Sequence, residues 1–142
     1  MGESINPDWE SKVRMNREVS DLFRALVEVG TVQAVRQEYQ VFRSAGGDFV
    51  LFSPSSRGSS SFHMTFVQVE KVDALGKMLT SDGVTTGSLM KDERLEEVFG
   101  SGEKVAKRFD LLMALYVLTA LGKAEMKKSG RILVFYKRRD EG

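Results

Sequence analysis

Residues 101–142 read SGEKVAKRFDLLMALYVLTALGKAEMKKSGRILVFYKRRDEG, and this stretch is the most informative part of the sequence. The spacing of its apolar residues predicts a helix over 102–121. Gly122 can end that helix, because glycine readily adopts the left-handed conformation found at helix C-termini. Residues 124–137 predict a β-hairpin that turns at 128–130, where lysine, serine and glycine follow one another. The stretch therefore consists of a helix, a glycine stop and a hairpin with a cationic turn.

The helix of this stretch contains an apolar block, Leu111–Leu121, without a charged side chain. The block is far shorter than the roughly 20 residues that a membrane-spanning helix needs. In a soluble protein, a helix that is apolar on all sides is surrounded by protein. We expect a homodimer that buries part of this helix. The alternative is a central core helix within one chain.

Charge is distributed unevenly along the chain, although its formal net charge is only +1. Residues 101–142 hold ten Lys and Arg against five acids, whereas the first hundred residues hold eleven bases against fifteen acids. A basic C-terminal part on a weakly acidic body indicates one surface that faces a polyanion. The alternative is that these bases only solvate an exposed hairpin.

Two shorter helices are predicted before this stretch. In 71–83, KVDALGKMLTSDG, apolar residues recur at helical spacing. Thr85 or Thr86 can cap a helix over 88–100, SLMKDERLEEVFG. Residues 71–142 are therefore expected to form three helices followed by the hairpin.

The segment from 71 to 137 resembles the winged helix-turn-helix family, in which a hairpin called the wing follows the recognition helix. The likeness rests on ALYVLTALGKAEMKKSGRILVFYK, residues 114–137, which is similar to the family's run from recognition helix through wing. It implies a protein that sits on DNA or on another protein. One feature departs from the family: its helix before the wing normally presents polar side chains to the major groove, and here only residues 103–110, EKVAKRFD, can do so.

The first half of the chain predicts helices and one hairpin. Apolar residues at helical spacing indicate a helix over 7–29 and a second helix over 32–45. Residues 48–70 contain DFVLFSP and SFHMTFVQVE, which predict two strands joined by SSRGSSS at 55–61. Apolar residues occur at both parities of the second strand, so either both of its faces are covered or a bulge lies near Phe66.

These elements together predict an α+β fold, mainly helical with two β-hairpins, whose C-terminal half is winged helix-like. Residues 1–70 would be a helical segment plus a hairpin, either an extension or a degenerate winged unit. Residues 71–142 would be the winged helix-like unit. Neither a proline-rich nor a long glycine linker separates the two parts, which favours one compact body.

The residue types exclude several kinds of chemistry. The chain has no cysteine and a single histidine, His63, which excludes disulfides, thiolate sites and any site that needs two imidazoles. The serine-rich loop lacks P-loop spacing and is better explained as a solvated hairpin tip. Asp92, Glu93, Glu96 and Glu97 form i,i+4 pairs, but such acids usually form the wet side of an amphipathic helix. We therefore predict no catalytic site, no metal and no cofactor, and hence no enzyme.

The basic C-terminal part predicts a nucleic-acid-binding protein, such as a DNA-binding transcriptional regulator of winged-helix type with double-stranded DNA as its partner. The residues expected to contact nucleic acid are Lys104, Lys107, Arg108, Lys127, Lys128, Arg131 and Lys137. The alternative is a non-enzymatic protein–protein interaction or assembly module that works through the apolar helix and an apolar stripe from Met15 to Val29. A third option is a ligand-sensing domain with the first hairpin as a pocket wall. The N-terminal residues MGESINPDWESKVR show no secretory or transit pattern, so we expect a cytoplasmic protein without a membrane partner.

Overall fold

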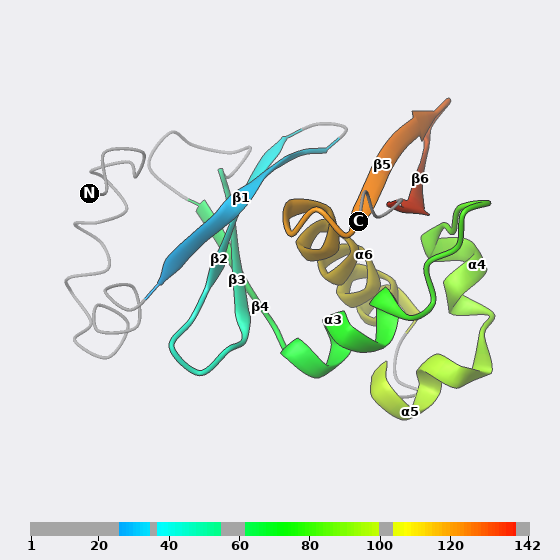
Figure 1. The fold of residues 1–142 in the computed structure, drawn as a ribbon, viewed down its shortest axis with the longest axis horizontal. Coiled ribbons are helices and arrows are strands. Elements are labelled where there is room, and N and C mark those ends of the chain that lie inside the picture. Colours follow the sequence, from blue (N-terminus) through cyan, green and yellow to red (C-terminus); the bar gives the residue numbers. More distant parts are fainter. Residues whose placement is uncertain (1–25, 35–36, 55–61, 100–103, 139–142) are drawn as a thin grey trace.

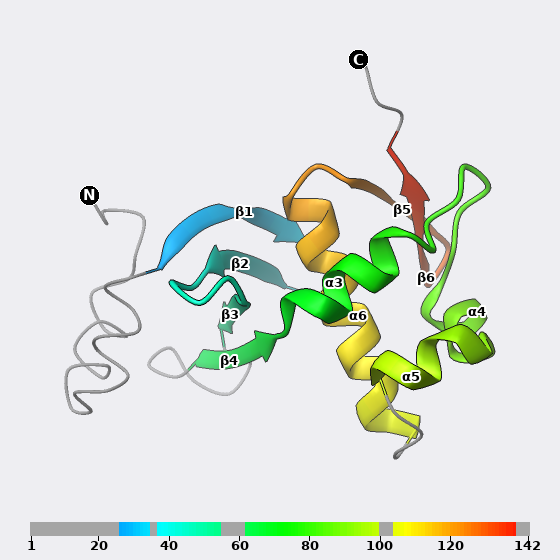
Figure 2. The same cartoon turned by 60° about the horizontal axis from the view of Figure 1, so that its bottom comes forward.

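The computed structural model describes residues 26–34, 37–54, 62–99 and 104–138 (Figure 1). The elements are, in chain order, β1 (Val27–Gln33), β2 (Glu38–Arg43), β3 (Phe49–Pro54), β4 (Phe62–Val67), α3 (Val69–Gly76), α4 (Thr86–Met90), the 3-10 helix η1 (Glu93–Leu95), α5 (Glu96–Phe99), α6 (Lys104–Ala120), β5 (Ala124–Ser129) and β6 (Ile132–Lys137). The first four strands form one antiparallel sheet in the order β1-β2-β3-β4, and β5 pairs with β6 in a second sheet. Figures 1 and 2 show the described helices on one side of the larger sheet.

The predicted helix over 32–45 is wrong, because this part of the chain forms the end of β1 and all of β2. Val32 and Phe42 match a helical spacing, but Thr31, Val32, Tyr39, Val41 and Phe42 are also β-branched or aromatic residues that fit a strand. The neighbouring strand β3 pairs with β2 and provides the partners for its backbone. Tertiary pairing therefore overrides the local helical pattern.

The end of the predicted helix over 7–29 is also wrong, because Val27–Val29 belong to β1. Its earlier residues, up to 25, lie outside the described part of the chain. Gly30 is a strand residue and not a helix stop. A Cβ atom there would come within 3.2 Å of the Ala120 carbonyl oxygen, so glycine permits a close approach of β1 to the end of α6.

The first predicted hairpin is confirmed as β3 and β4, within a sheet of four strands. The register runs without interruption from Phe49 opposite Val67 to Pro54 opposite Phe62, so no bulge lies near Phe66. Val67 is buried in the main core, whereas the neighbouring Phe66 is 56% exposed on the other face. The serine-rich loop at 55–61 lies outside the described residues.

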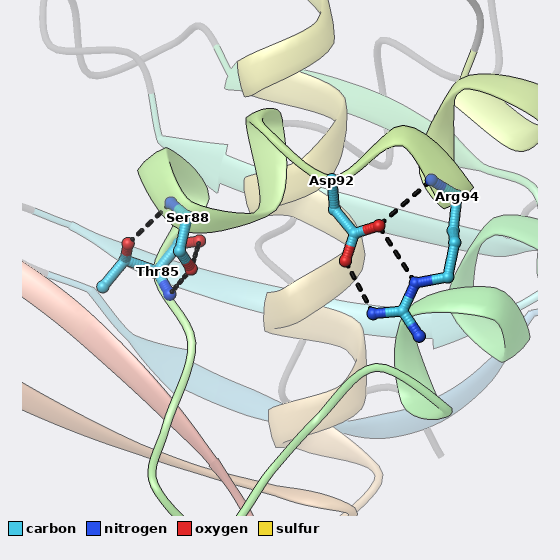
Figure 3. Close-up of polar contacts among 4 residues, drawn as sticks. All are labelled: Thr85, Ser88, Asp92 and Arg94. Atoms are coloured by element: carbon cyan, nitrogen blue, oxygen red, sulfur yellow. Dashed lines mark hydrogen bonds and ion pairs between the residues drawn. The ribbon is translucent and has the colours of Figure 1, made fainter.

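Of the three helices predicted in the second half, those in 71–83 and over 102–121 are confirmed as the shorter α3 and α6, whereas the single helix predicted over 88–100 is wrong. The stretch 71–83 contains most of α3, which begins two residues earlier, and the stretch 88–100 divides into α4, η1 and α5. Thr85 caps α4, since its side chain accepts a hydrogen bond from the Ser88 backbone N–H at 3.0 Å and the Ser88 hydroxyl accepts one from the Thr85 N–H. This reciprocal pair is a capping box, drawn in Figure 3.

Helix α6 is the centre of the main core, between the larger sheet and the other helices (Figures 1 and 2). Leu111, Ala114, Leu115 and Val117 have no exposed surface. The apolar block is therefore enclosed within one chain, which is the core-helix alternative of the sequence interpretation. The apolar character of α6 accordingly gives no support to a homodimer.

The fold class is α+β, as expected, but the prediction of a mainly helical protein is wrong. The structure has about 36% helix and 38% strand, with six strands in two antiparallel sheets over the described residues. A four-stranded sheet takes the place of the isolated first hairpin. Within the described part of the chain, no helix is long and apolar enough to cross a membrane.

Candidate nucleic-acid interface

The hairpin starts where α6 ends, at Gly122. This residue has a φ of 80°, the left-handed conformation that the sequence predicts for it. The Gly122 N–H donates to the Thr119 carbonyl at 3.1 Å and the Lys123 N–H donates to the Leu118 carbonyl at 2.9 Å, the bond pattern of a Schellman motif. The motif reverses the chain so that β5 begins at Ala124 beside the helix.

The tip of the hairpin lies one residue later than predicted. Ser129 pairs with Ile132, so Gly130 and Arg131 are the two central residues of the turn. Gly130 has a φ of 64° and Arg131 does not have a positive φ, which is the pattern of a type II′ turn. Arg131 is therefore the most distal of the predicted bases on this hairpin.

The short segment around Val84 joins the hairpin to the rest of the molecule. Val84 and Phe135 exchange two backbone hydrogen bonds, each of 2.8 Å, in an antiparallel bridge. The Lys137 N–H also donates to the Thr80 carbonyl at 2.8 Å. These bonds fix one edge of the hairpin to the loop between α3 and α4, while its turn extends beyond them.

A groove of about 970 Å³ lies between the hairpin tip, α6, α4 and the ends of β1 and β2. Arg108 on α6 lines it together with Lys128 and Arg131 on the hairpin. Tyr39 on β2 and Thr86 on α4 come from the other two walls. Three basic residues therefore line this groove, and none of its described lining residues is acidic.

The other predicted bases do not share this groove. Lys127 is on the opposite face of β5 from Lys128, with its Nζ 5.5 Å from the centre of the Tyr136 ring and 4.0 Å from a Glu125 carboxylate oxygen. Lys107 is buried, at 8% exposed. The Lys104 side chain lies outside what the structure describes.

Lys137 lines a second hollow, of about 690 Å³, at the other end of the hairpin. Lys77, Lys123 and Arg138 line it as well, and Asp73 adds one carboxylate. Its walls are the C-terminal parts of α3 and α6, where helix dipoles favour cations. The seven predicted bases are thus divided between sites, and only Arg108, Lys128 and Arg131 come together.

Two tyrosines that the sequence interpretation missed lie in the groove. The rings of Tyr39 and Tyr116 are 4.8 Å apart between centroids and tilted by 37°. The Gln37 side-chain amide donates to the Tyr39 hydroxyl at 2.8 Å. Tyr116 is 3% exposed, and its burial raises the pKa of its phenol to about 12, with a smaller contribution from Tyr39. No signal in the sequence pairs β2 with α6, because residues 37–39 fall in a segment with a helical pattern.

The acidic helix and the histidine form no catalytic constellation in the described residues. Asp92 caps η1 and binds Arg94, whose guanidinium donates to both carboxylate oxygens, at 2.7 and 3.0 Å (Figure 3). The hydrogen bonds from Arg94 lower the pKa of this carboxyl. His63 is exposed on β4. No group of three or more His, Asp or Glu in the described parts of the chain could hold a metal ion.

Comparisons with known proteins add no family to these observations. The chain matches no family model, no curated protein and no solved structure.

Proposed function

We propose that this protein is a non-enzymatic nucleic-acid-binding protein that contacts phosphates with Arg108, Lys128 and Arg131. The observation that supports the proposal is the convergence of these three cations, from a helix and a hairpin, on one groove without an acidic lining residue in the described structure. Bases that neutralise phosphates release condensed counterions, and this release drives binding that is independent of sequence.

The burial of α6 indicates that this surface would bind nucleic acid with little dependence on base sequence. From Leu111 to Leu118 the helix is mostly inside the core, and of these residues only the apolar Leu112 and the buried Tyr116 line the groove, so Arg108 is the polar side chain that the described part of α6 presents there. Arg108 and the hairpin bases would then contact the sugar-phosphate backbone of the nucleic acid. Such contacts position the nucleic acid but carry no sequence information. We therefore expect binding with little base specificity.

The order of elements around the groove supports the winged-helix form of this proposal. Helix α3, the bridge at Val84, α4, the short helices η1 and α5, α6 and the β5–β6 hairpin follow one another in the chain, and the hairpin extends beyond α6 as a wing would. In that arrangement the ligand to test first is double-stranded DNA. A homodimer would present the groove twice. The homodimer stays a prediction, and a molar mass measured in solution would test it.

The test is a titration of labelled duplex DNA at two salt concentrations. If three phosphates are neutralised, the logarithm of the affinity should fall with the logarithm of salt at a slope of about −2.7, or about 40-fold between roughly 50 and 200 mM. A variant in which Arg108, Lys128 and Arg131 are all changed to alanine should lose most of this binding and this slope.

The matched control removes the same charge from the second hollow, through alanine at Lys77, Lys123 and Lys137. Its affinity should stay near that of the unchanged protein, because these side chains line another site. Equal losses in the two variants would show a general charge effect and would contradict the assignment to the groove. Failure of the unchanged protein to bind any nucleic acid, together with stable co-purification of another chain, would favour the interaction-module alternative.

A further inference from the structure

We propose that the groove receives a nucleic-acid strand with unpaired bases, and that one base stacks on Tyr39. This inference rests on the proposed function and specifies its ligand. The inference follows from the apolar side chains that line the groove, because phosphate contacts alone give these side chains no role in binding.

The groove combines two kinds of surface. Three basic side chains line it. The other part of the lining is more apolar: Tyr39, Leu112 and Leu133 are half-buried, and the Ile132 side chain is 57% exposed. A duplex backbone presents phosphates and sugars to a protein surface and keeps its bases stacked inside. A single strand offers phosphates and the flat faces of its bases together. The second ligand therefore matches the lining more completely.

Tyr39 is held in a fixed position that suits stacking. One side of its ring packs against Tyr116, at 4.8 Å between centroids, and its hydroxyl accepts a hydrogen bond from Gln37 at 2.8 Å. The residue is only half-buried, whereas Tyr116 beneath it is 3% exposed. Of these two rings, Tyr39 is therefore the one that a base can reach.

The cations of the groove complete the arrangement. Lys128 is opposite Leu133 in the hairpin register, and both residues line the groove, so an apolar wall and a cationic group occur side by side at this position. Proteins that bind single strands without sequence preference combine such a basic groove with aromatic side chains. Stacking tolerates any base because every base has a π-face, which agrees with the low base specificity expected above.

The experiment compares three labelled probes of equal length, about 12 nucleotides. They are a single-stranded oligothymidylate, an abasic oligomer with the same phosphates, and a duplex. The unchanged protein should bind oligothymidylate more tightly than either other probe. Tyr39→Leu, which keeps apolar bulk against Tyr116 but removes the π-face, should weaken oligothymidylate binding about 5- to 150-fold. Tyr39→Phe should stay close to the unchanged protein, since it retains the ring.

The abasic probe separates stacking from damage to the groove. Tyr39→Leu should bind it as the unchanged protein does, because that probe has no base to stack. Equal losses of both single-stranded probes, or unchanged oligothymidylate binding by Tyr39→Leu, would overturn the inference. So would equal affinity of the unchanged protein for all three probes. In that last case the phosphate-binding function would still stand, if alanine at Arg108, Lys128 and Arg131 abolished binding. Absence of binding to every probe would overturn both proposals.

Discussion

At the scale of single residues, Tyr116 links the core to the groove. Burial raises the pKa of its phenol to about 12, and the neighbouring Tyr39 contributes to the same direction. The ordinary tyrosine pKa, about 10, applies in the unfolded chain. Because the folded pKa is the higher one, the native state favours the neutral phenol. This contribution to stability is complete below about pH 10 and is lost as the pH rises toward 12.

We predict that Tyr116→Phe reduces the loss of unfolding free energy between about pH 10 and pH 12, since phenylalanine has no proton to release. Urea unfolding at several pH values, on this variant and on the unchanged protein, measures the difference. The ultraviolet absorbance of phenolate in the folded protein should also show an ionisation near pH 12 that Tyr116→Phe lacks. As a control, Tyr136→Phe should leave that ionisation in place. An absorbance titration that Tyr116→Phe leaves unchanged would contradict the prediction.

At the scale of elements, a capping residue and a glycine in the sequence correctly predict where one helix begins and another ends. Thr85 marks the start of α4 because its side chain caps the helix, and Gly122 marks the end of α6 because that position needs a positive φ. The helix predicted over 32–45 was wrong because its pattern, which includes Val32, Tyr39 and Phe42, fits a helix and a strand equally well. Antiparallel pairing with β3, the next strand along the chain, decides between the two.

The glycine stop of α6 can be tested directly. A Cβ at Gly122 would have only an ordinary contact, 3.6 Å from Arg138, so the cost of Gly122→Ala is the left-handed backbone conformation itself. We expect the free energy of unfolding to fall by about 1 kcal/mol. Gly76→Ala is the control, since Gly76 ends α3 without a positive φ and should be neutral or slightly stabilising. Urea denaturation compares the two, and equal effects would contradict this account.

At the scale of the whole molecule, the candidate site is only partly predictable from the sequence. Arg108, Lys128 and Arg131 follow from charge and from the order of helix and hairpin, because these elements are adjacent in the chain. Lys107 also belongs to that cluster in the sequence, yet its position on α6 turns it into the protein. Tyr39 could not be predicted, because the contact between β2 and α6 depends on how the sheet packs on the helix.

The central position of α6 leads to a prediction about assembly. Leu115 has no exposed surface within one chain, so Leu115→Ala should lower the free energy of unfolding by about 2–5 kcal/mol. Leu112→Ala, at a half-buried position that borders the groove, should cost less. If one chain encloses the helix, the loss caused by Leu115→Ala is the same at low and at high protein concentration, because a second copy adds nothing to the burial of Leu115. A loss that changes with concentration, together with a Leu115→Ala variant of lower molar mass, would show instead that a partner subunit helps to bury α6, and the predicted homodimer would then have a structural basis.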